Sequence, residues 1–577
     1  MIRVHFMGIG GSGMASAAAI AKAYGYKISG CDLKTGGHSP DHLQNVDILC
    51  VSPAIFFQNN NHPEVELARQ KNILMTWQEF MGNYLHKDKF VICVAGTHGK
   101  STTTAMVGKL LEQSGLDPTV EFGANNGHRI GKSKYFVTEA DEFYSNFLHY
   151  HPNIVILNNI ELDHPEYFGT TKNMLNIIQK FIDQIKPGGT LIYNTDSPLI
   201  RKLKLPKNSI PYSISEFPKD LILKVLGDHN KSNAMGVIKL AGLLGLLKSD
   251  YVKTLENFQG IDRRLQELGT VNDITVVDDY ANHPTAFSNN IKALREKYSG
   301  KPIWVVIEPH TFSRLRAVLP DLAPALKDAD HVIISKIFAS READPGDFSG
   351  ADIAKTIPNA LYIPEFPNIV QYLTSNVQPQ SIILVMGSGN SDKLAREILI
   401  RQKYPKFVYK SFSKETIDDK LVLKFEYQTP PDLAFTHTLE FLNLENFECD
   451  DVLIFNIGLS EMFSYWKATC SPVVEIQAGF LTSEQIAFWH KLFIRGMGEY
   501  YYKNQIDFTD KDFIVIKTTN TSPPTPSPKL GEGKSRGEVL IPIGGGKDSI
   551  VTLEILKKHF KILPMMINPV PAMIDVC

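Results

Sequence analysis

The sequence predicts an α/β protein made of several domains, and three observations support this prediction. Short runs rich in β-branched residues alternate with helical stretches from the N-terminus to about residue 400, a pattern typical of parallel sheets covered by helices. Two glycine-rich loops each lie between such a strand and a helix. The chain has 577 residues, which is enough for about three to five domains.

The composition is that of an ordinary globular protein. Hydrophobic residues make up 43%, charged residues 21%, and the net charge is -2. These values exclude wholesale disorder and offer no general attraction for nucleic acid or an anionic membrane. No stretch of about 20 apolar residues is present, so we expect no membrane insertion. The six cysteines lack CxxC or metal-like spacing and no signal peptide precedes the first strand, which favours a reducing cytoplasm.

The first glycine-rich loop follows the predicted strand 2–7. Gly8, Gly10, Gly11 and Gly13 satisfy the GxGxxG pattern and precede a helix of small residues. Such a loop brings a diphosphate close to backbone amides at a helix N-terminus. Asp32, at the end of the next predicted strand, is placed where an acid can bind a ribose. The pattern alone leaves open a turn that serves only packing, and it does not choose between NAD and another nucleotide.

The second glycine-rich loop follows the predicted strand 91–95. It reads Gly96, Thr97, His98, Gly99, Lys100, Ser101 and Thr102. Backbone amides and a lysine can surround the phosphates of ATP, and the serine hydroxyl can bind Mg²⁺. The loop is shorter than the GxxxxGK[ST] pattern requires, so a plain turn is the alternative interpretation.

Acidic residues and a histidine follow the next two predicted strands. Glu139 directly follows the strand-like segment 135–138, and His164 is the last residue of the polar stretch after the strand 154–158. The carboxyl ends of parallel strands face the ligand side of an open sheet. Together with Ser101, these residues are our candidate metal ligands; taken singly, each is as well explained as a solvated loop residue.

The domain organisation follows from shifts in this pattern. A polar stretch at 86–89 separates the two loop units, a helical stretch ends near Gly260, and the strand–helix alternation stops around 401–406. The following segment is richer in aromatic residues, and a later one is dominated by Pro, Ser, Thr and Gly. The expected units are 1–87, 88–260, 261–402, 403–517, a linker at 518–537, and a last segment at 538–577.

Eight motifs occur in the order found in Mur ligases: GIGGSGM, GTHGKSTTT, EADE, NIELDH, GDHNKSNA, DRRLQ, DDYANHPTA and PHTFSR. Residues 1–400 therefore resemble this family, and most of all its members that join L-alanine to UDP-N-acetylmuramate. The resemblance implies three domains: a Rossmann-like UDP-sugar domain, a P-loop-like ATPase domain and a Rossmann-like closing domain. It also implies ATP and Mg²⁺ as cofactors and an acyl-phosphate intermediate in peptidoglycan precursor synthesis.

The resemblance also implies residue roles. Gly8–Gly13 with Asp32 would bind the UDP-sugar, and Lys100 with Mg²⁺ on Ser101, Glu139 and His164 would neutralise the phosphates. In the closing domain, the γ-phosphate would meet Arg263 or Arg264. The remaining assignments are Asn230 for adenine, Asp278, Asp279 and Tyr280 for the nucleotide, and His283 and Arg314 for the amino acid.

Departures from the family pattern leave alternatives open. Asn282 stands where the family pattern has His, which bears on amino-acid selectivity, and the stretch between Asp196 and Gly227 is short. The alternatives are a murein-tripeptide recycling ligase, an NAD-linked oxidoreductase that uses the first loop, and a catalytically weakened module that only binds precursors.

The last part of the chain resembles a different kind of enzyme. Residues 460–507 and the loop Gly544, Gly545, Gly546, Lys547, Asp548 and Ser549 are similar to the N-terminal part of ATP-dependent UDP-N-acetylmuramoyl-L-alanyl-L-glutamate epimerases. A GGxDS loop between a strand and a helix suits the phosphates of ATP. Because few residues follow Ser549, we expect an incomplete α/β module that is inactive alone, or one that a split partner polypeptide completes.

Overall fold

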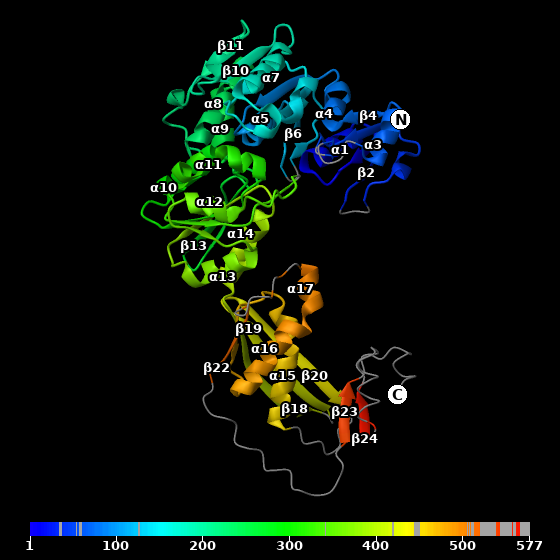
Figure 1. The fold of residues 1–577 in the computed structure, drawn as a ribbon, viewed down its shortest axis with the longest axis vertical. Helices are drawn as coiled ribbons and strands as arrows, with labels where there is room; N and C mark the ends of the chain where they lie inside the picture. The colour runs from blue at the N-terminus through cyan, green and yellow to red at the C-terminus, as the bar shows by residue number, and fades with distance from the viewer. Residues whose placement is uncertain are drawn as a thin grey trace.

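The computed structural model describes most of the chain. The described residues are 1–33, 37–53, 55–56, 61–124, 127–340, 342–417, 420–442, 450–504, 506, 508, 513–519, 538–542, 557 and 561–565. Figure 1 shows the first two units side by side at one end of the long axis, the third unit below the second, and the C-terminal module at the other end. No helix among these residues is long and apolar enough to span a membrane.

The first unit is a small parallel sheet with helices beside it. Its described strands lie in the order β2-β1-β3-β4 and all pair in parallel. Helix α1 follows the first glycine-rich loop. It packs closely on the sheet because most residues of SGMASAAAIAKA are small. The strands are β1 (Arg3–Met7), β2 (Lys27–Cys31), β3 (Ile48–Val51) and β4 (Leu74–Thr76), and the helices are α1 (Ser12–Ala23), η1 (Pro40–Leu43) and α3 (Pro63–Gln70).

The second unit is a larger sheet in the order β11-β10-β9-β5-β8-β6-β7. Its central strand β5 is almost entirely buried, as expected for a parallel strand with helices on both faces. The strands are β5 (Phe90–Ala95), β6 (Thr119–Glu121), β7 (His128–Arg129), β8 (Tyr135–Ala140), β9 (Ile154–Leu157), β10 (Thr190–Asn194) and β11 (Ser209–Tyr212). The helices include α5 (Lys100–Gln113), α6 (Pro165–Phe168), α7 (Thr171–Asp183), α8 (Asp228–Leu243) and α9 (Lys248–Asn257).

The third unit is a mixed sheet in the order β12-β13-β17-β14-β15-β16. Only the pairing of β12 with β13 is antiparallel among its described pairs. The strands are β12 (Gln266–Val271), β13 (Ile274–Asp279), β14 (Ile303–Ile307), β15 (His331–Ile334), β16 (Ala360–Tyr362) and β17 (Ile382–Met386). The helices are α10 (Pro284–Lys297), α11 (Phe312–Leu326), α12 (Gly350–Thr356), α13 (Phe366–Asn376) and α14 (Ser391–Lys403).

The C-terminal module has its own sheet, in the order β20-β19-β18-β21-β22. Long antiparallel strands form one half, and two short strands parallel to β18 form the other. Its elements are β18 (Lys406–Ile417), β19 (Lys420–Thr429), β20 (Leu433–Leu442), α15 (Asp451–Trp466), β21 (Val473–Ile476), α16 (Ser483–Gly496), α17 (Gly498–Asn504) and β22 (Val515–Thr518). The backbone also pairs β23 (Glu538–Pro542) in parallel with β24 (Lys561–Met565).

The hydrophobic cores show which units pack together. One core joins residues of the first sheet, such as Phe6, through Phe80 and Leu85 to residues of the second unit, such as Phe136 and Tyr150. The third unit and the C-terminal module have cores of their own. The predicted α/β class with three successive nucleotide-binding-type units is confirmed. The second and third units meet mainly through polar side chains.

Candidate active site

A cavity of about 610 Å³ lies between the second and third units. The second glycine-rich loop lines one side of it, and residues after β13, including Tyr280 and His283, line the other. Both sets lie at the carboxyl ends of parallel strands, where open α/β sheets bind their ligands. The cavity therefore joins most of the residues predicted to bind ATP.

The backbone of the second glycine-rich loop depends on its glycines. Gly96 and Gly99 have φ values of 128° and 79°, which favour glycine. A Cβ atom at Gly99 would also lie 2.3 Å from Oδ1 of Asn233 on α8. Helix α5 begins at Lys100 directly after this turn, so the free amides of its first turn face the cavity edge as an anion site requires.

Lys100 is held by carbonyl and carboxylate oxygens. Its Nζ donates to the Gly96 carbonyl at 2.7 Å and to Glu142 Oε2 at 2.9 Å. Burial opposes the charge on Lys100, but the carboxylates of Glu142, Asp141 and Glu139 outweigh it and raise the lysine pKa. Burial in turn raises the pKa of Glu142. The Lys100 ammonium is thus charged and poised beside the loop.

Ser101 and Glu139 form a pair of oxygen ligands in the same cavity. The Ser101 hydroxyl donates to Glu139 Oε2 at 2.7 Å, and the Gly123 N–H donates to the same oxygen at 3.0 Å. A hydroxyl and a carboxylate are hard oxygen donors, which Mg²⁺ prefers. The donor set therefore fits the predicted magnesium, although His164, the third predicted ligand, is not among the residues that line this cavity.

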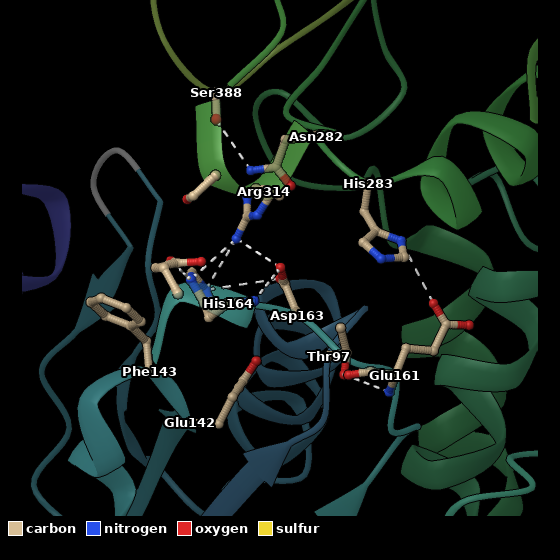
Figure 2. Close-up of polar contacts among 12 residues, drawn as sticks. Thr97, Glu142, Phe143, Glu161, Asp163, His164, Asn282, His283, Arg314 and Ser388 are labelled. Atoms are coloured by element: carbon tan, nitrogen blue, oxygen red, sulfur yellow. Dashed lines mark hydrogen bonds and ion pairs between the residues drawn. The ribbon is translucent and has the colours of Figure 1, made fainter. Parts of the chain in front are cut away.

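Two histidines and a glutamate lie at the cavity where the second and third units meet, and Figure 2 shows His283 and Glu161. His98 Nε2 lies 3.0 Å from Glu161 Oε2, and His283 Nδ1 lies 3.6 Å from the same oxygen. Thr97 Oγ donates to the Glu161 carbonyl at 3.0 Å. Burial, followed by the nearby His98, lowers the pKa of His283, so its imidazole is neutral at neutral pH.

Arg314 crosses the same boundary to a second cluster (Figure 2). Its Nη2 lies 2.8 Å from Asp163 Oδ1 and 3.2 Å from His164 Nε2, while His164 Nδ1 lies 3.0 Å from Glu166. Burial opposes the charge of Asp163, but His164 and Arg314 outweigh it and lower the Asp163 pKa. The arginine is itself 4% exposed. The structure therefore places His164 and Arg314 together, in a contact between units.

Two of the predicted residues in the third unit do not line the cavity. Arg263 donates to the Gly387 carbonyl and to Ser391 Oγ, each at 2.8 Å, and its Nε lies 3.4 Å from the buried carboxylate of Asp278. Neither Arg263 nor Asp278 lines the cavity, whereas their neighbours Arg264 and Asp279 do. Of the two arginines proposed to reach the γ-phosphate, the structure brings Arg264 to the cavity and holds Arg263 inside the third unit.

The remaining predicted nucleotide residues line the cavity. Asn230 on α8 donates to the Leu226 carbonyl at 2.8 Å. The Tyr280 ring lies beside both arginines, with its centre 4.9 Å from the guanidinium carbon of Arg263 and 5.3 Å from that of Arg264. Asn282, the departure from the family pattern, donates to Ser388 Oγ at 3.2 Å (Figure 2). Its carboxamide therefore has a partner within the third unit.

The first glycine-rich loop is closed by Asp32. The Gly10 N–H donates to Asp32 Oδ2 at 3.1 Å, and the Gly8 N–H donates to the Cys31 carbonyl at 2.8 Å. A Cβ atom at Gly10 would lie 2.7 Å from the Asp32 carboxylate. The acid predicted to bind a ribose thus stands directly against the loop, and its role in binding a ribose stays a prediction.

Sequence reasoning missed three residues that complete the site. Glu142 is the ion-pair partner of Lys100, Asp163 is that of Arg314, and Asn233 packs against Gly99. Each lies within a motif quoted above, so the motif was visible in the sequence. Its partner in space was not, because the contacts join segments far apart in the chain.

Comparison with known proteins gives a family for residues 3–389. The models that match are described as Mur ligase family, catalytic domain (residues 3–88), Mur ligase middle domain (residues 94–241), and Mur ligase, glutamate ligase domain (residues 263–389). The C-terminal part, residues 400–577, matches a model described as MurL N-terminal domain. The glycine loops, the cavity and these matches define an ATP-dependent ligase of the Mur type.

Curated relatives narrow the family further. The chain is 32% identical over 454 residues to the UDP-N-acetylmuramate–L-alanine ligase of Acetivibrio thermocellus, covering 69% of this chain and 96% of the relative. It is 33% identical to the enzyme of the same name from Alkaliphilus metalliredigens, with the same two coverages. This chain therefore belongs to the Mur ligase family, and the predicted resemblance is confirmed.

Solved structures agree with the fold. The UDP-N-acetylmuramate-alanine ligase of Thermotoga maritima superposes with a TM-score of 0.59 at 23% identity, covering 70% of this chain and 99% of that one. A murein peptide ligase from Psychrobacter arcticus gives 0.53 at 23% identity, covering 69% and 98%. At these identities the likeness speaks for the fold alone. The predicted loop Gly544–Ser549 lies outside the described residues.

Proposed function

We propose that this chain joins L-alanine to UDP-N-acetylmuramate in peptidoglycan precursor synthesis, with hydrolysis of ATP to ADP and phosphate. The observation that carries the proposal is the cavity in which Lys100, Ser101 and Glu139 of one unit meet Arg264 and His283 of the next. The names of the curated relatives support this choice of substrates.

The first step transfers the γ-phosphoryl group to the sugar-borne carboxylate. A carboxylate oxygen forms a bond to phosphorus, the bond to the bridging oxygen breaks, and ADP leaves. Such a transfer depends on positive charge and in-line positioning. Lys100 supplies charge from the loop and Arg264 supplies it from the third unit. Lys100 must exchange its bond to Glu142 for one to phosphate.

Ser101 and Glu139 are the residues that would hold Mg²⁺, which when bound supplies charge neutralisation to the phosphates. Glu139 is preset for this role, because the Gly123 amide fixes the oxygen that also accepts the Ser101 bond. Ser101 sits in the first turn of α5, so the hydroxyl is placed by the same turn that presents the loop amides.

The second step is attack of the alanine nitrogen on the acyl phosphate. A C–N bond forms, the C–O bond to phosphate breaks, and the amine loses a proton. His283 lines the cavity, and its pKa is lowered chiefly by burial. A neutral imidazole can accept that proton or a hydrogen bond from the amine. Closure of the third unit onto the second brings His283 into place.

The test is an assay for phosphate and ADP. Protein, ATP, Mg²⁺ and UDP-N-acetylmuramate are incubated with and without L-alanine, and then with serine and glycine. Phosphate release that rises on addition of L-alanine, and less with the other two, is the expected result. No rise with any amino acid would overturn the proposal and favour a module that only binds precursors.

The same assay separates the other two alternatives. A murein-tripeptide recycling ligase would release phosphate with the tripeptide L-alanyl-γ-D-glutamyl-diaminopimelate in place of L-alanine. An NAD-linked oxidoreductase would bind NADH at the first loop without competition from the UDP-sugar. The oxidoreductase alternative does not account for a second glycine-rich loop that lines a cavity together with His283 and Asn282.

For residues 400–577 we propose a relation to the epimerases that act on a later form of the same precursor. The match to the MurL N-terminal domain supports this relation. Epimerase activity of residues 400–577 stays a prediction. The test incubates the full chain with ATP and UDP-N-acetylmuramoyl-L-alanyl-L-glutamate and measures the D-glutamate formed. We expect none from this chain alone, and D-glutamate formation would contradict that expectation. The split partner polypeptide and the cytoplasmic location remain predictions as well.

A further inference from the structure

The first unit contains a cluster of metal-binding side chains that the ligase reaction does not use. His5 on β1, Cys31 at the end of β2, His42 in η1 and Glu64 in α3 each offer one ligand atom, and these atoms lie within 4.8 Å of one another. The cluster is buried, apart from the partly exposed His42. It lies next to the first glycine-rich loop, and none of its residues lines the ATP cavity.

The distances from Glu64 to the other three ligand atoms suit one tetrahedral ion. Glu64 Oε1 lies 3.5 Å from His5 Nε2, 3.5 Å from His42 Nδ1 and 3.8 Å from Cys31 Sγ. Around zinc, with Zn–N and Zn–O near 2.0–2.1 Å and Zn–S near 2.3 Å, neighbouring ligand atoms are about 3.3 to 3.6 Å apart. The observed separations differ from this by a few tenths of an ångström.

The ring of His5 is oriented as a ligand. Its Nδ1 lies 2.9 Å from Ser29 Oγ, while its buried Nε2 points at the cluster and has no hydrogen-bond partner among the described residues. A partner on one ring nitrogen that leaves the other toward the ion is the usual arrangement of a metal-binding histidine.

The burial of Glu64 is a second observation that favours a metal ion in the cluster. Its side chain is 0% exposed, and the ion-pair partners recorded for it within the described part of the chain are the imidazoles of His5 and His42. A buried carboxylate without a cation is costly. A doubly charged ion bound to Glu64 and to the Cys31 thiolate would leave the site with no net charge.

We propose that His5, Cys31, His42 and Glu64 bind a structural zinc ion. The ion replaces the proton of the Cys31 thiol, which passes to solvent as the Zn–S bond forms. It also replaces the hydrogen bond of 3.3 Å that the Ser39 N–H makes to His42 Nδ1. His38, whose Nδ1 lies 3.0 Å from Cys31 Sγ, remains beside the sulfur.

The position of the site gives it a consequence for the glycine-rich loop. The Cys31 carbonyl accepts hydrogen bonds from the Gly8 and Ile9 amides, and the next residue, Asp32, accepts one from the Gly10 amide. Zinc on the Cys31 sulfur therefore fixes the strand end on which the loop rests. Loss of the ion should loosen this loop and leave the ATP cavity unchanged.

The experiment uses the full chain without an affinity tag. Zinc content is measured after gel filtration, and the protein is then exchanged with Co²⁺ and its absorption recorded. We expect one zinc per chain and a thiolate-to-cobalt charge-transfer band in the near ultraviolet. Cys31→Ser should abolish the band and weaken zinc binding by at least about 10- to 100-fold. His5→Asn should weaken it as well.

Cys50→Ala is the matched control, because Cys50 is a buried free thiol of the same sheet and lies outside the cluster. It should keep both the zinc and the band. The group His98, Glu161 and His283 contains no sulfur, so zinc bound there would give no such band. Folded wild-type protein that retains no zinc and shows no thiolate band after cobalt loading would overturn the proposal. That result does not depend on whether the variants fold.

Discussion

Lys100 is the residue on which phosphoryl transfer depends most directly. In the structure its ammonium is paired with Glu142 and with the loop carbonyl of Gly96. Replacing it by methionine removes the charge while keeping much of the side-chain volume. We expect turnover to fall at least about 100-fold, as for loss of one preorganised charge at a transferring group, measured as alanine-dependent phosphate release.

Lys109 on the same helix is the control for this change. It is exposed, and it forms an ion pair with Glu112 of the same helix at 2.9 Å. Lys109→Met should leave turnover within a factor of about two, since an exposed pair contributes little. Near-normal turnover of Lys100→Met beside an unchanged Lys109→Met would remove Lys100 from its proposed role.

Arg263 and Arg264 are adjacent but should fail in different ways when replaced. Arg263→Ala leaves Asp278 buried without its cation, and loss of one partner of a buried pair costs about 3–5 kcal/mol. We therefore expect a lower melting temperature. Arg264→Ala should instead lower alanine-dependent turnover with a small change in melting temperature. The reverse pattern, measured by calorimetry and the phosphate assay, would show that Arg263 is the residue that reaches the phosphate.

These two arginines also show the limit of sequence reasoning at a single residue. The DRRLQ motif indicates that an arginine of the third unit is functional, but it does not say which. Arg263 has a φ of 59°, an unusual left-handed backbone for a residue other than glycine. No spacing in the sequence reveals that local conformation, or that Arg264 and not Arg263 lines the cavity.

At the level of elements, helix α11 carries the contact that joins the second and third units. Arg314 in its first turn meets Asp163 and His164, which come just before α6 (Figure 2). Both His164 and Thr311, which precede these helices, have left-handed φ values of 52° and 60°. Such strain costs about 1–3 kcal/mol per residue and is found mainly at functional sites. We infer that this contact forms when the third unit closes onto the second.

Arg314→Met should weaken closure and lower kcat/KM. Asp163→Asn should do the same, and the double variant should lose less than the sum of the two. We expect a coupling of about 1–3 kcal/mol in the activation free energy, as for residues in direct contact. Arg316→Met on the same helix is the control, because Arg316 is exposed and pairs with Asp347 within the third unit. Strictly additive effects would mean that Arg314 and Asp163 act separately.

The positions of the strands and helices were largely predictable from the sequence. Which residues of distant segments come into contact was not. The expected strand 2–7 appears as β1 at Arg3–Met7, and the expected strand 91–95 as β5 at Phe90–Ala95. Continuous apolar runs bounded by glycine loops are strong local signals. The metal-binding cluster of the first unit illustrates the opposite case: its ligands come from four separate elements, so Cys31 shows no metal-like spacing.

At the scale of the whole molecule, the units differ in how they are joined. The first two share one hydrophobic core, so they should move together. The second and third meet across a polar cavity and the ion pairs of Arg314 and His283. Polar interfaces of this kind allow domain motion, and the ATP cavity lies at this one. The sequence predicted the three units but not which boundary is rigid, because that depends on side chains from both sides.

His86 tests the shared core through its response to pH. The ring is buried against Phe136 and Tyr150, at 4.5 and 4.7 Å between ring centres. Burial, followed by Lys186 and His151, lowers its pKa from 6.5 to about 3. Below pH 6.5 the unfolded chain therefore takes up a proton that the folded chain excludes, so stability falls as the pH is lowered.

The expected size of this effect is large enough to measure. At about pH 5 the His86 contribution amounts to about 2 kcal/mol relative to neutral pH, since one pKa unit corresponds to about 1.4 kcal/mol. His86→Phe keeps an aromatic ring in the core and removes the titration. The melting temperature of its first unfolding transition, measured by calorimetry, should therefore fall less between neutral pH and pH 5 than that of the wild type. Equal shifts in the His86→Phe variant and the wild type would mean that His86 is not the titrating group.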